Sequence, residues 1–242
     1  MDGDRVVLLH GFTQTGRCWG PFGELLNRFH EVSAIDLPGH GSRTEVRTDL
    51  PGTAELLAPE CEGATVIGYS LGGRVALHIA LTTPIARLVL ISSTGGLDDA
   101  EERAARRTAD ERLADRVEQI GVDAFLDEWL AQPLFASLDA RAACLDERRT
   151  NTAAGLASSL RLCGTGTQRP LWGELASIAA PSLVITGSLD DKFDALGARL
   201  VESIGPSASH VVIDDAGHSA QLERPDATAD AVLEWIAATT HR

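Results

Sequence analysis

Short apolar runs alternate with longer mixed stretches along the first part of the chain. Runs at residues 6–9, 32–36, 65–68 and 88–92 each have the length and composition of a buried strand, and the segments between them have helical spacing. Strands that alternate with helices form parallel sheets, because the chain must cross back over the sheet before it starts the next strand. We therefore predict an α/β fold with a mostly parallel central sheet.

The pattern changes in the middle of the chain. From Asp98 to about Trp172 helical spacing dominates, with an interruption at Pro133, and the alternation of strands and helices resumes at Ser182. A helical insertion in such a sheet is expected to lie over the carboxyl ends of the strands, where open α/β sheets bind ligands. The expected domains are an α/β core of residues 1–94 and 173–242 and a helical cap of residues 95–172.

The sequence G-Y-S-L-G at residues 68–72 lies between a strand-like run and a helix-like segment. Gly68 and Gly72 allow the backbone to crowd at a sharp strand-to-helix turn, which lifts the hydroxyl of Ser70 out of the sheet. Ser70 is therefore the candidate nucleophile or base.

Candidate partners for the serine follow two later strands. The strand-like run that begins at Ser182 leads to Asp190, with Asp191 as its rival, and the run after residue 210 leads to His218. The chain order serine, aspartate, histidine is typical of α/β hydrolases and differs from that of the common serine proteases. We predict Ser70, Asp190 and His218 as the catalytic residues.

Negative charge that develops on a substrate oxygen needs fixed donors. The first strand leads into His10-Gly11-Phe12, which resembles the oxyanion loop of the α/β hydrolases. In that fold the two donors are backbone amides, here those of Phe12 and Leu71. The segment D-L-P-G-H-G at residues 36–41 is interpreted as a rigid turn near the site.

Charge restricts the class of ligand. The net charge of −14 disfavours nucleic acid and anionic membrane surfaces. It allows a small anionic substrate, because local guanidinium groups outweigh a distant field once a carboxylate is held in a poorly hydrated pocket. We find no motif for a metal or for a nucleotide cofactor, so neither is expected.

Location follows from three further observations. No apolar run approaches the roughly 20 residues of a membrane span, so no membrane insertion is expected. The acidic start at residues 1–4 is unlike a signal peptide. Four scattered cysteines form no C-x-x-C pair, which indicates reduced thiols and a cytoplasmic protein.

A narrower resemblance extends over nearly the whole chain. G-Y-S-L-G-G-R, A-E-E-R-A-A-R-R, E-W-L-A-Q-P-L-F-A-S-L, R-R-T-N and G-S-L-D-D-K-F together resemble the MenH family, the 2-succinyl-6-hydroxy-2,4-cyclohexadiene-1-carboxylate synthases. The resemblance implies a lyase of menaquinone biosynthesis that eliminates pyruvate from 2-succinyl-5-enolpyruvyl-6-hydroxy-3-cyclohexene-1-carboxylate. It also implies an α/β-hydrolase fold. The first two antiparallel strands that are common in this fold are expected to be missing or vestigial, because the apolar run at residues 6–9 already leads into His10-Gly11-Phe12.

The resemblance further implies a set of substrate contacts, and arginine suits a polycarboxylate. The matching positions are Tyr69, Arg74, Arg106, Trp129 and Arg149. Two assignments stay open. Arg103, Arg106 and Arg107 occupy positions i, i+3 and i+4 of the predicted helix, so all three share one face and Arg103 and Arg107 are rivals of Arg106. Arg148 is likewise a rival of Arg149.

Two other functions are compatible with the same motifs. One is a serine carboxylesterase or thioesterase that forms a covalent acyl-enzyme. The other is a non-catalytic α/β hydrolase that binds a ligand under its cap, although the complete set of serine, aspartate and histidine argues against it. We expect a monomer or at most a weak dimer.

Overall fold

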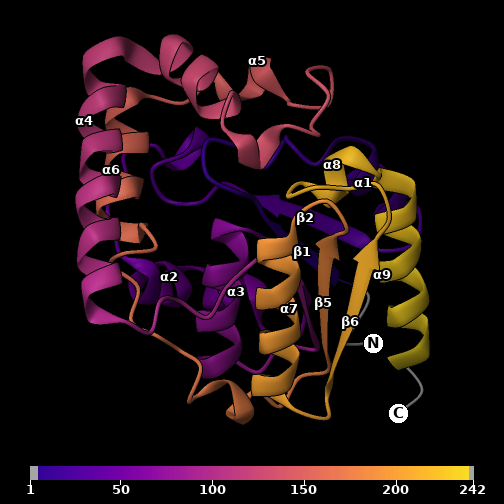
Figure 1. Cartoon of the computed structure of the whole chain (residues 1–242). Helices are drawn as coiled ribbons and strands as arrows, with labels where there is room; N and C mark the ends of the chain where they lie inside the picture. Colours follow the sequence, from indigo (N-terminus) through magenta and orange to yellow (C-terminus); the bar gives the residue numbers. More distant parts are fainter. Residues whose placement is uncertain (1–4, 240–242) are drawn as a thin grey trace.

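The computed structural model describes residues 5–239, so the acidic start at residues 1–4 lies outside it. Within this range six strands form one sheet in the order β2-β1-β3-β4-β5-β6, and all neighbours are parallel (Figure 1). The strands are β1 (Arg5–Leu9), β2 (Glu31–Ile35), β3 (Thr65–Tyr69), β4 (Arg87–Ile91), β5 (Ser182–Gly187) and β6 (Ala208–Ile213). The predicted α/β fold with a parallel sheet is confirmed.

Alternate residues of each strand enter opposite hydrophobic layers, as the period of two requires. In β1, Val7 and Leu9 face one layer and Val6 and Leu8 face the other. The first layer is closed by α2 (Leu50–Cys61), α3 (Leu71–Thr82) and α7 (Asp191–Ile204). The second is closed by α1 (Gly20–Leu26) and α9 (Pro225–Thr239), with the short α8 (Ala220–Glu223) beside them.

A helical insertion separates β4 from β5. It contains α4 (Ala100–Leu130), the 3-10 turn η2 (Pro133–Phe135), α5 (Leu145–Arg148) and α6 (Ala153–Cys163), and η3 (Leu175–Ser177) follows it. Helices α4 and α6 lie side by side along one edge of the molecule in Figure 1, and α5 lies above the sheet. They enclose a small core of their own, which includes Val117, Phe125 and Leu156.

The insertion contains less regular helix than its spacing predicts. Helix α4 is broken at Gly121, whose φ of 79° is outside the helical region. Between α4 and α5 the chain forms η2 and turns, because Pro133 lacks a backbone donor and Cys144 has a φ of 58°. These breaks turn the backbone back over the sheet.

The two ends of the insertion are joined at the sheet. The amide of Leu171 donates to the carbonyl of Gly95 (2.8 Å), and the indole N–H of Trp172 donates to that of Gly96 (3.0 Å). The guanidinium of Arg199 lies 3.8 Å from the centroid of the Trp172 ring, which adds a cation–π contact. The insertion is thereby held against the carboxyl ends of the strands.

Residues 5–239 include no helix that combines the length and the apolar character needed to cross a bilayer. The same residues bring together no group of three or more histidine, cysteine, aspartate or glutamate side chains that could hold a metal ion. All four cysteines, which fall in this range, are free.

Candidate active site

The turn from β3 into α3 presents Ser70 in a strained conformation. Its φ is 50° and its ψ is −106°, which a residue other than glycine rarely adopts. A Cβ on Gly72 would lie 1.9 Å from the carbonyl oxygen of Leu9, and one on Gly68 would lie 2.4 Å from that of Gly72. The two glycines are therefore required for the close approach of α3 to β1, and this approach exposes the serine hydroxyl to the pocket.

Ser70, His218 and Asp190 lie in one hydrogen-bonded row, and each follows the carboxyl end of a different strand. The Nδ1 of His218 is 2.9 Å from Oδ2 of Asp190, and its Nε2 is 3.2 Å from Oγ of Ser70. Because a carboxylate only accepts, Nδ1 carries the proton and Nε2 accepts from the serine. The structure places Asp190, rather than the exposed Asp191, against the histidine.

The row is kept in place by its surroundings. Asp190 caps α7 by accepting from the amide of Phe193 (3.2 Å), so its second oxygen is left for His218. The ring of Phe193 meets the imidazole edge to face, with centroids 4.3 Å apart. His218 is 2% exposed, so its orientation is set by packing as well as by hydrogen bonds.

The two amides predicted to hold an oxyanion lie at the same pocket. Phe12 and Leu71 both line the pocket that contains Ser70. Among the residues that the structure describes, neither amide donates to another protein group. Leu71 is the first residue of α3, where an N–H has no partner within the helix. The arrangement can therefore accept an anionic oxygen beside the serine.

Two buried histidines fix the loop that carries Phe12. The amide of Leu37 donates to Nε2 of His10, whose Nδ1 donates to the carbonyl of Gly11 (2.8 Å). His40 accepts from the amide of Thr13 (3.3 Å) and donates to a carbonyl of its own turn. Burial lowers the pKa of His10 to about 4 and that of His40 to about 3, so both are neutral at pH 7.

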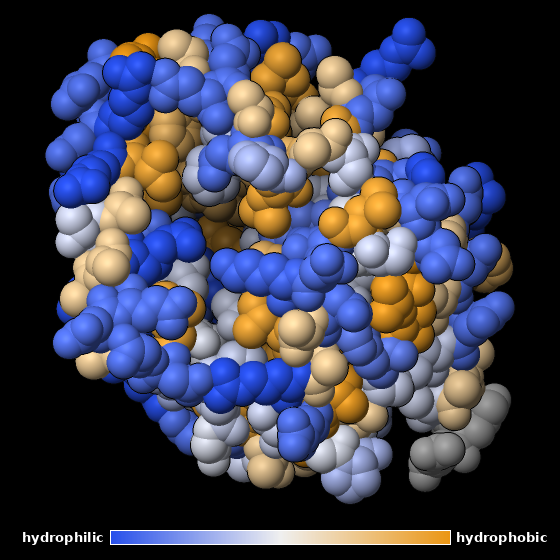
Figure 2. All heavy atoms as spheres, viewed as in Figure 1, coloured by the Kyte–Doolittle hydropathy of each residue, from blue (hydrophilic) through white to orange (hydrophobic). Residues whose placement is uncertain are grey.

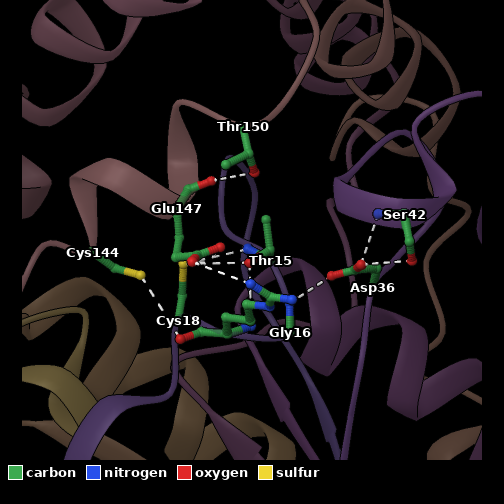
Figure 3. Close-up of polar contacts among 9 residues, drawn as sticks. Thr15, Gly16, Cys18, Asp36, Ser42, Cys144, Glu147 and Thr150 are labelled. Carbon is green, nitrogen blue, oxygen red and sulfur yellow. Dashed lines mark hydrogen bonds and ion pairs between the residues drawn. The ribbon is translucent and has the colours of Figure 1, made fainter.

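Asp36 adds a third anchor to the same loop. Its two carboxylate oxygens accept from the amide of Gly16 (2.7 Å) and from the amide and hydroxyl of Ser42 (both 2.8 Å), as Figure 3 shows. Burial raises the pKa of Asp36, but these hydrogen bonds outweigh it and hold the pKa below its usual value. The D-L-P-G-H-G segment thus positions the loop after β1, in line with its interpretation as a rigid turn near the site.

A pocket of about 320 Å³ lies between the sheet and the insertion. Figure 2 shows this face hollowed between the α4–α6 layer and α7, with hydrophobic residues in its depth and hydrophilic residues around the rim. Ser70 and His218 are at its floor, and Trp129 and Phe135 of the insertion contribute to its lining. The pocket combines an apolar wall with the four cations Arg74, Arg106, Arg148 and Lys192.

Arg74 belongs to the core, one helical turn after the serine. Its side chain is buried, and Nη1 donates to Oε1 of Gln168 (3.3 Å). Burial lowers its pKa to about 10, so the guanidinium remains charged at pH 7. It supplies a fixed positive charge beside the reacting centre.

Of the three arginines that share a face of α4, Arg106 lines the pocket. Its Nε donates to Asp110 (2.8 Å). Arg103 instead donates to the carbonyls of Leu97 and Asp98, which cap the start of the helix. Arg107 points to the carbonyl of Gly166, outside the pocket lining. The geometry favours the predicted Arg106 over its two neighbours.

For the second open pair, Arg148 and Arg149, the geometry favours the rival of the predicted residue. Arg149, the predicted contact, lies on the surface and forms ion pairs with Asp123 and Asp146, both at 3.4 Å. Arg148 is 1% exposed, lines the pocket and donates from Nε to the carbonyl of Ala143 (2.6 Å). The difference arises because Arg148 ends the short α5 on its inner side, and the sequence R-R does not say which neighbour faces inward.

Arg148 also joins the insertion to the oxyanion loop. Its Nη1 donates to the carbonyl of Phe12 (3.4 Å) and to the hydroxyl of Thr13. Asn151 donates to the carbonyl of Thr13 (2.7 Å). The loop is therefore held from the sheet and from the insertion together.

Trp129 and Tyr69 both line the pocket. The Trp129 ring meets Phe12 edge to face at 5.0 Å, and within the described residues its buried Nε1 has no protein acceptor. The hydroxyl of Tyr69 hydrogen-bonds Ser219 (2.7 Å), and burial raises its pKa. Tyr69 therefore offers the pocket its ring, whereas Trp129 retains a free donor.

Several pocket residues were missed by sequence reasoning. These are Asp110, Phe135, Lys192 and Phe193, together with Gln168, which lies outside the lining and contacts it through Arg74. Phe135 and the pair Lys192-Phe193 lay within motifs quoted for the family resemblance, which was the available signal. Asp110 and Gln168 lay outside those motifs, and each acts only through its contact with an arginine, Arg106 or Arg74, that packing brings beside it.

Known proteins resemble this chain in sequence and in fold. A model of the alpha/beta hydrolase family matches residues 6–231. A 2-succinyl-6-hydroxy-2,4-cyclohexadiene-1-carboxylate synthase of Citrobacter koseri is 34% identical over 96% of this chain and 93% of its own length. The structure of MenH from S. aureus has a TM-score of 0.91 at 28% identity and covers 98% of this chain and 94% of its own.

More distant structures share the architecture alone. A thermophilic esterase from Thermogutta terrifontis has a TM-score of 0.78 at 24% identity, with 97% of this chain and 90% of that chain covered. At this level of identity the likeness extends to the fold and carries no argument about the reaction.

Proposed function

The chain belongs to the α/β hydrolase family and, within it, to the 2-succinyl-6-hydroxy-2,4-cyclohexadiene-1-carboxylate synthases. On that premise we propose that it is the lyase of menaquinone biosynthesis. It eliminates pyruvate from 2-succinyl-5-enolpyruvyl-6-hydroxy-3-cyclohexene-1-carboxylate. The observation that carries the proposal is the union of an intact serine, histidine and aspartate row with a pocket lined by several guanidinium groups. The first supplies a base, and the second suits a substrate with several carboxylates.

The base is assembled from Ser70 and His218. Asp190 holds the Nδ1 proton of His218, so that Nε2 remains free to take the hydroxyl proton of Ser70. The activated serine then removes the ring proton at C2, which is acidic because it lies α to the succinyl ketone. The C2 proton restores the serine hydroxyl, and His218 keeps the proton that it took from Ser70. The resulting imidazolium is stabilised by the Asp190 carboxylate.

The electron balance of the elimination is simple. The C2–H electrons form the C2–C3 double bond, the C3–C4 double bond moves to C4–C5, and the C5–O bond to the enolpyruvyl group breaks. The departing enolate gains a proton and becomes pyruvate, with imidazolium His218 as the nearest acid. No bond forms between the serine and the substrate.

Charge on the ketone oxygen is stabilised by the loop after β1 and the start of α3. The amides of Phe12 and Leu71, which lack protein acceptors in the described chain, would donate to it. Because His10, His40 and Asp36 fix this loop, the donors need little reorganisation as the charge develops.

The pocket arginines hold the carboxylates. Arg74 and Arg148 are buried and charged sites of fixed position, and Arg106 reaches in from α4. We assign these three to substrate carboxylates and Trp129 to the apolar wall, and we leave Arg149 outside the site. The helical insertion then serves as a cap that excludes water from the enolate.

The partner is a small polycarboxylate, and the working form is a cytoplasmic monomer. Pyruvate release from the purified precursor, followed with a coupled dehydrogenase, tests this function. The wild-type protein should release one pyruvate per substrate consumed, with the spectrum of a conjugated diene, and Ser70→Ala should not. A wild-type protein that leaves this substrate intact but cleaves acyl thioesters would contradict it.

A further inference from the structure

Asp110 is a pocket residue that the elimination does not use. Its side chain is 2% exposed, and it is the only carboxylate among the described residues that line the pocket of Ser70. A buried negative charge beside a site for carboxylates repels them and weakens their binding, so we expect it to have another role that compensates for this cost.

The geometry of its ion pair suggests that task. Arg106, one helical turn earlier, donates from Nε to Oδ1 of Asp110 at 2.8 Å. This contact uses the side edge of the guanidinium and leaves both Nη groups for other partners. In the part of the chain that the structure describes, neither Nη group of Arg106 donates to a protein acceptor, and Arg106 lines the pocket.

Asp110 is itself held from the other side. Its Oδ2 accepts from the amide of Gly166 at 3.4 Å. A Cβ on Gly164 would lie 2.4 Å from the same oxygen, so the glycine is needed for the segment after α6 to close over the carboxylate. The carboxylate is therefore fixed by two segments, whereas the side chain of Arg106 is 41% exposed and has no other anchor among the described residues.

The charges around Asp110 also indicate that it holds Arg106 in place. Arg74 is close enough that Arg106 lowers its pKa and Asp110 raises it, although burial is the larger influence. Without the carboxylate the two guanidinium groups would repel each other, and the exposed Arg106 would turn toward water.

We propose that Asp110 is a positioning residue, which holds Arg106 by Nε so that its two Nη groups face the pocket and pair with a carboxylate of the substrate. This role rests on the proposed function, because it requires an anionic substrate. It assigns Asp110 no contact with the reacting atoms.

A double-mutant cycle tests the role. Asp110→Asn keeps the size and an acceptor but removes the charge that orients Arg106, so KM should rise about tenfold with kcat changed less than about threefold. In an Arg106→Ala background the carboxylate has nothing to orient and only repels substrate. There the same change should leave kcat/KM unaltered or raise it. Asp115→Asn, on the outer face of the same helix, is the matched control and should change neither parameter.

The outcomes separate positioning from a structural role. Equal losses from Asp110→Asn in both backgrounds would overturn the proposal, because a residue that only supports the fold acts independently of Arg106. If Asp110→Asn does not fold, Arg106→Lys replaces it. A lysine can pair with Asp110 but has no second edge, so KM should rise almost as much as in Arg106→Ala, and full activity of this variant would overturn the proposal.

Failure of the proposed function is seen separately, as the absence of pyruvate release by the wild-type protein. In that case the same variants are compared by inhibition of p-nitrophenyl acetate hydrolysis by succinate. Inhibition of Asp110→Asn should require about tenfold more succinate than inhibition of wild type or Asp115→Asn. An unchanged inhibition constant in Asp110→Asn would overturn the positioning role.

Discussion

The two sides of the pocket are built in contrasting ways. The sheet side places Ser70, Asp190 and His218 on turns that follow three parallel strands, where glycine contacts and buried hydrogen bonds leave one backbone path. The insertion side presents Arg106 from a long, polar helix whose outer face is held by surface ion pairs, such as those of Arg161 with α4. On the proposed function the sheet side carries the chemistry, and substrate carboxylates are held from both sides, by Arg74 of the core and by Arg106 and Arg148 of the insertion.

The largest effects are expected on the sheet side. Ser70→Ala and His218→Ala should each lower kcat by about 10³-fold or more, and the double mutant should lose little beyond that, because the two residues act as one base. Steady-state pyruvate release measures this. Fully additive losses would mean that serine and histidine work independently.

The choice of acid has its own matched pair. Asp190→Asn should reduce kcat by about 10³-fold, because an amide would leave His218 in the wrong tautomer, whereas Asp191→Asn should stay within about threefold. The same assay compares them. A larger loss from Asp191→Asn than from Asp190→Asn would contradict the observed geometry.

The next largest effect distinguishes Arg148, the last residue of α5, from Arg149, its C-cap residue. Arg148→Ala removes a buried cation that also supports Phe12 and Thr13, so kcat/KM should fall about 10²-fold or more and the protein should lose stability. Arg149→Ala removes surface ion pairs only and should change kcat/KM less than about twofold. The reverse order would place Arg149 at the substrate and return to the family assignment.

A smaller effect concerns acid stability of the loop that carries Phe12. The pKa of His10 is lowered to about 4 and that of His40 to about 3 in the folded protein, so the unfolded chain binds more protons below pH 6.5. The contribution of the two neutral histidines to the free energy of unfolding is complete above pH 6.5. It decreases as the pH falls toward their pKa values in the folded protein. The expected loss is about 1.4 kcal/mol of unfolding free energy per pH unit for each group.

Urea unfolding at pH 7.5 and pH 5.0 measures this slope. His40→Gln keeps one donor and one acceptor at the ring position without titrating, so it should reduce the slope by one group. An identical slope in wild type and His40→Gln would show that His40 is not kept neutral by burial.

The same contrast explains how far the sequence could be read. The strands, the elbow and the order of Ser70, Asp190 and His218 follow from local rules, since a sharp strand-to-helix turn needs glycines at fixed spacing. By contrast, whether Arg106 points into the pocket, and which of Arg148 and Arg149 does so, depends on how an amphipathic segment rotates against the sheet. Asp110 could not be recognised at all, because its partners Arg106, Gly164 and Gly166 meet only after α4 and α6 pack together.

The central claim is that the serine row removes a proton without becoming acylated, and intact mass analysis of the protein during turnover tests it most directly. Wild-type protein, mixed rapidly with the precursor and quenched in acid within one turnover, should keep its unmodified mass at every time point while pyruvate accumulates. A species heavier by a substrate-derived acyl group, absent from Ser70→Ala and decaying at the rate of turnover, would contradict the account and identify the protein as an acyl-transfer enzyme.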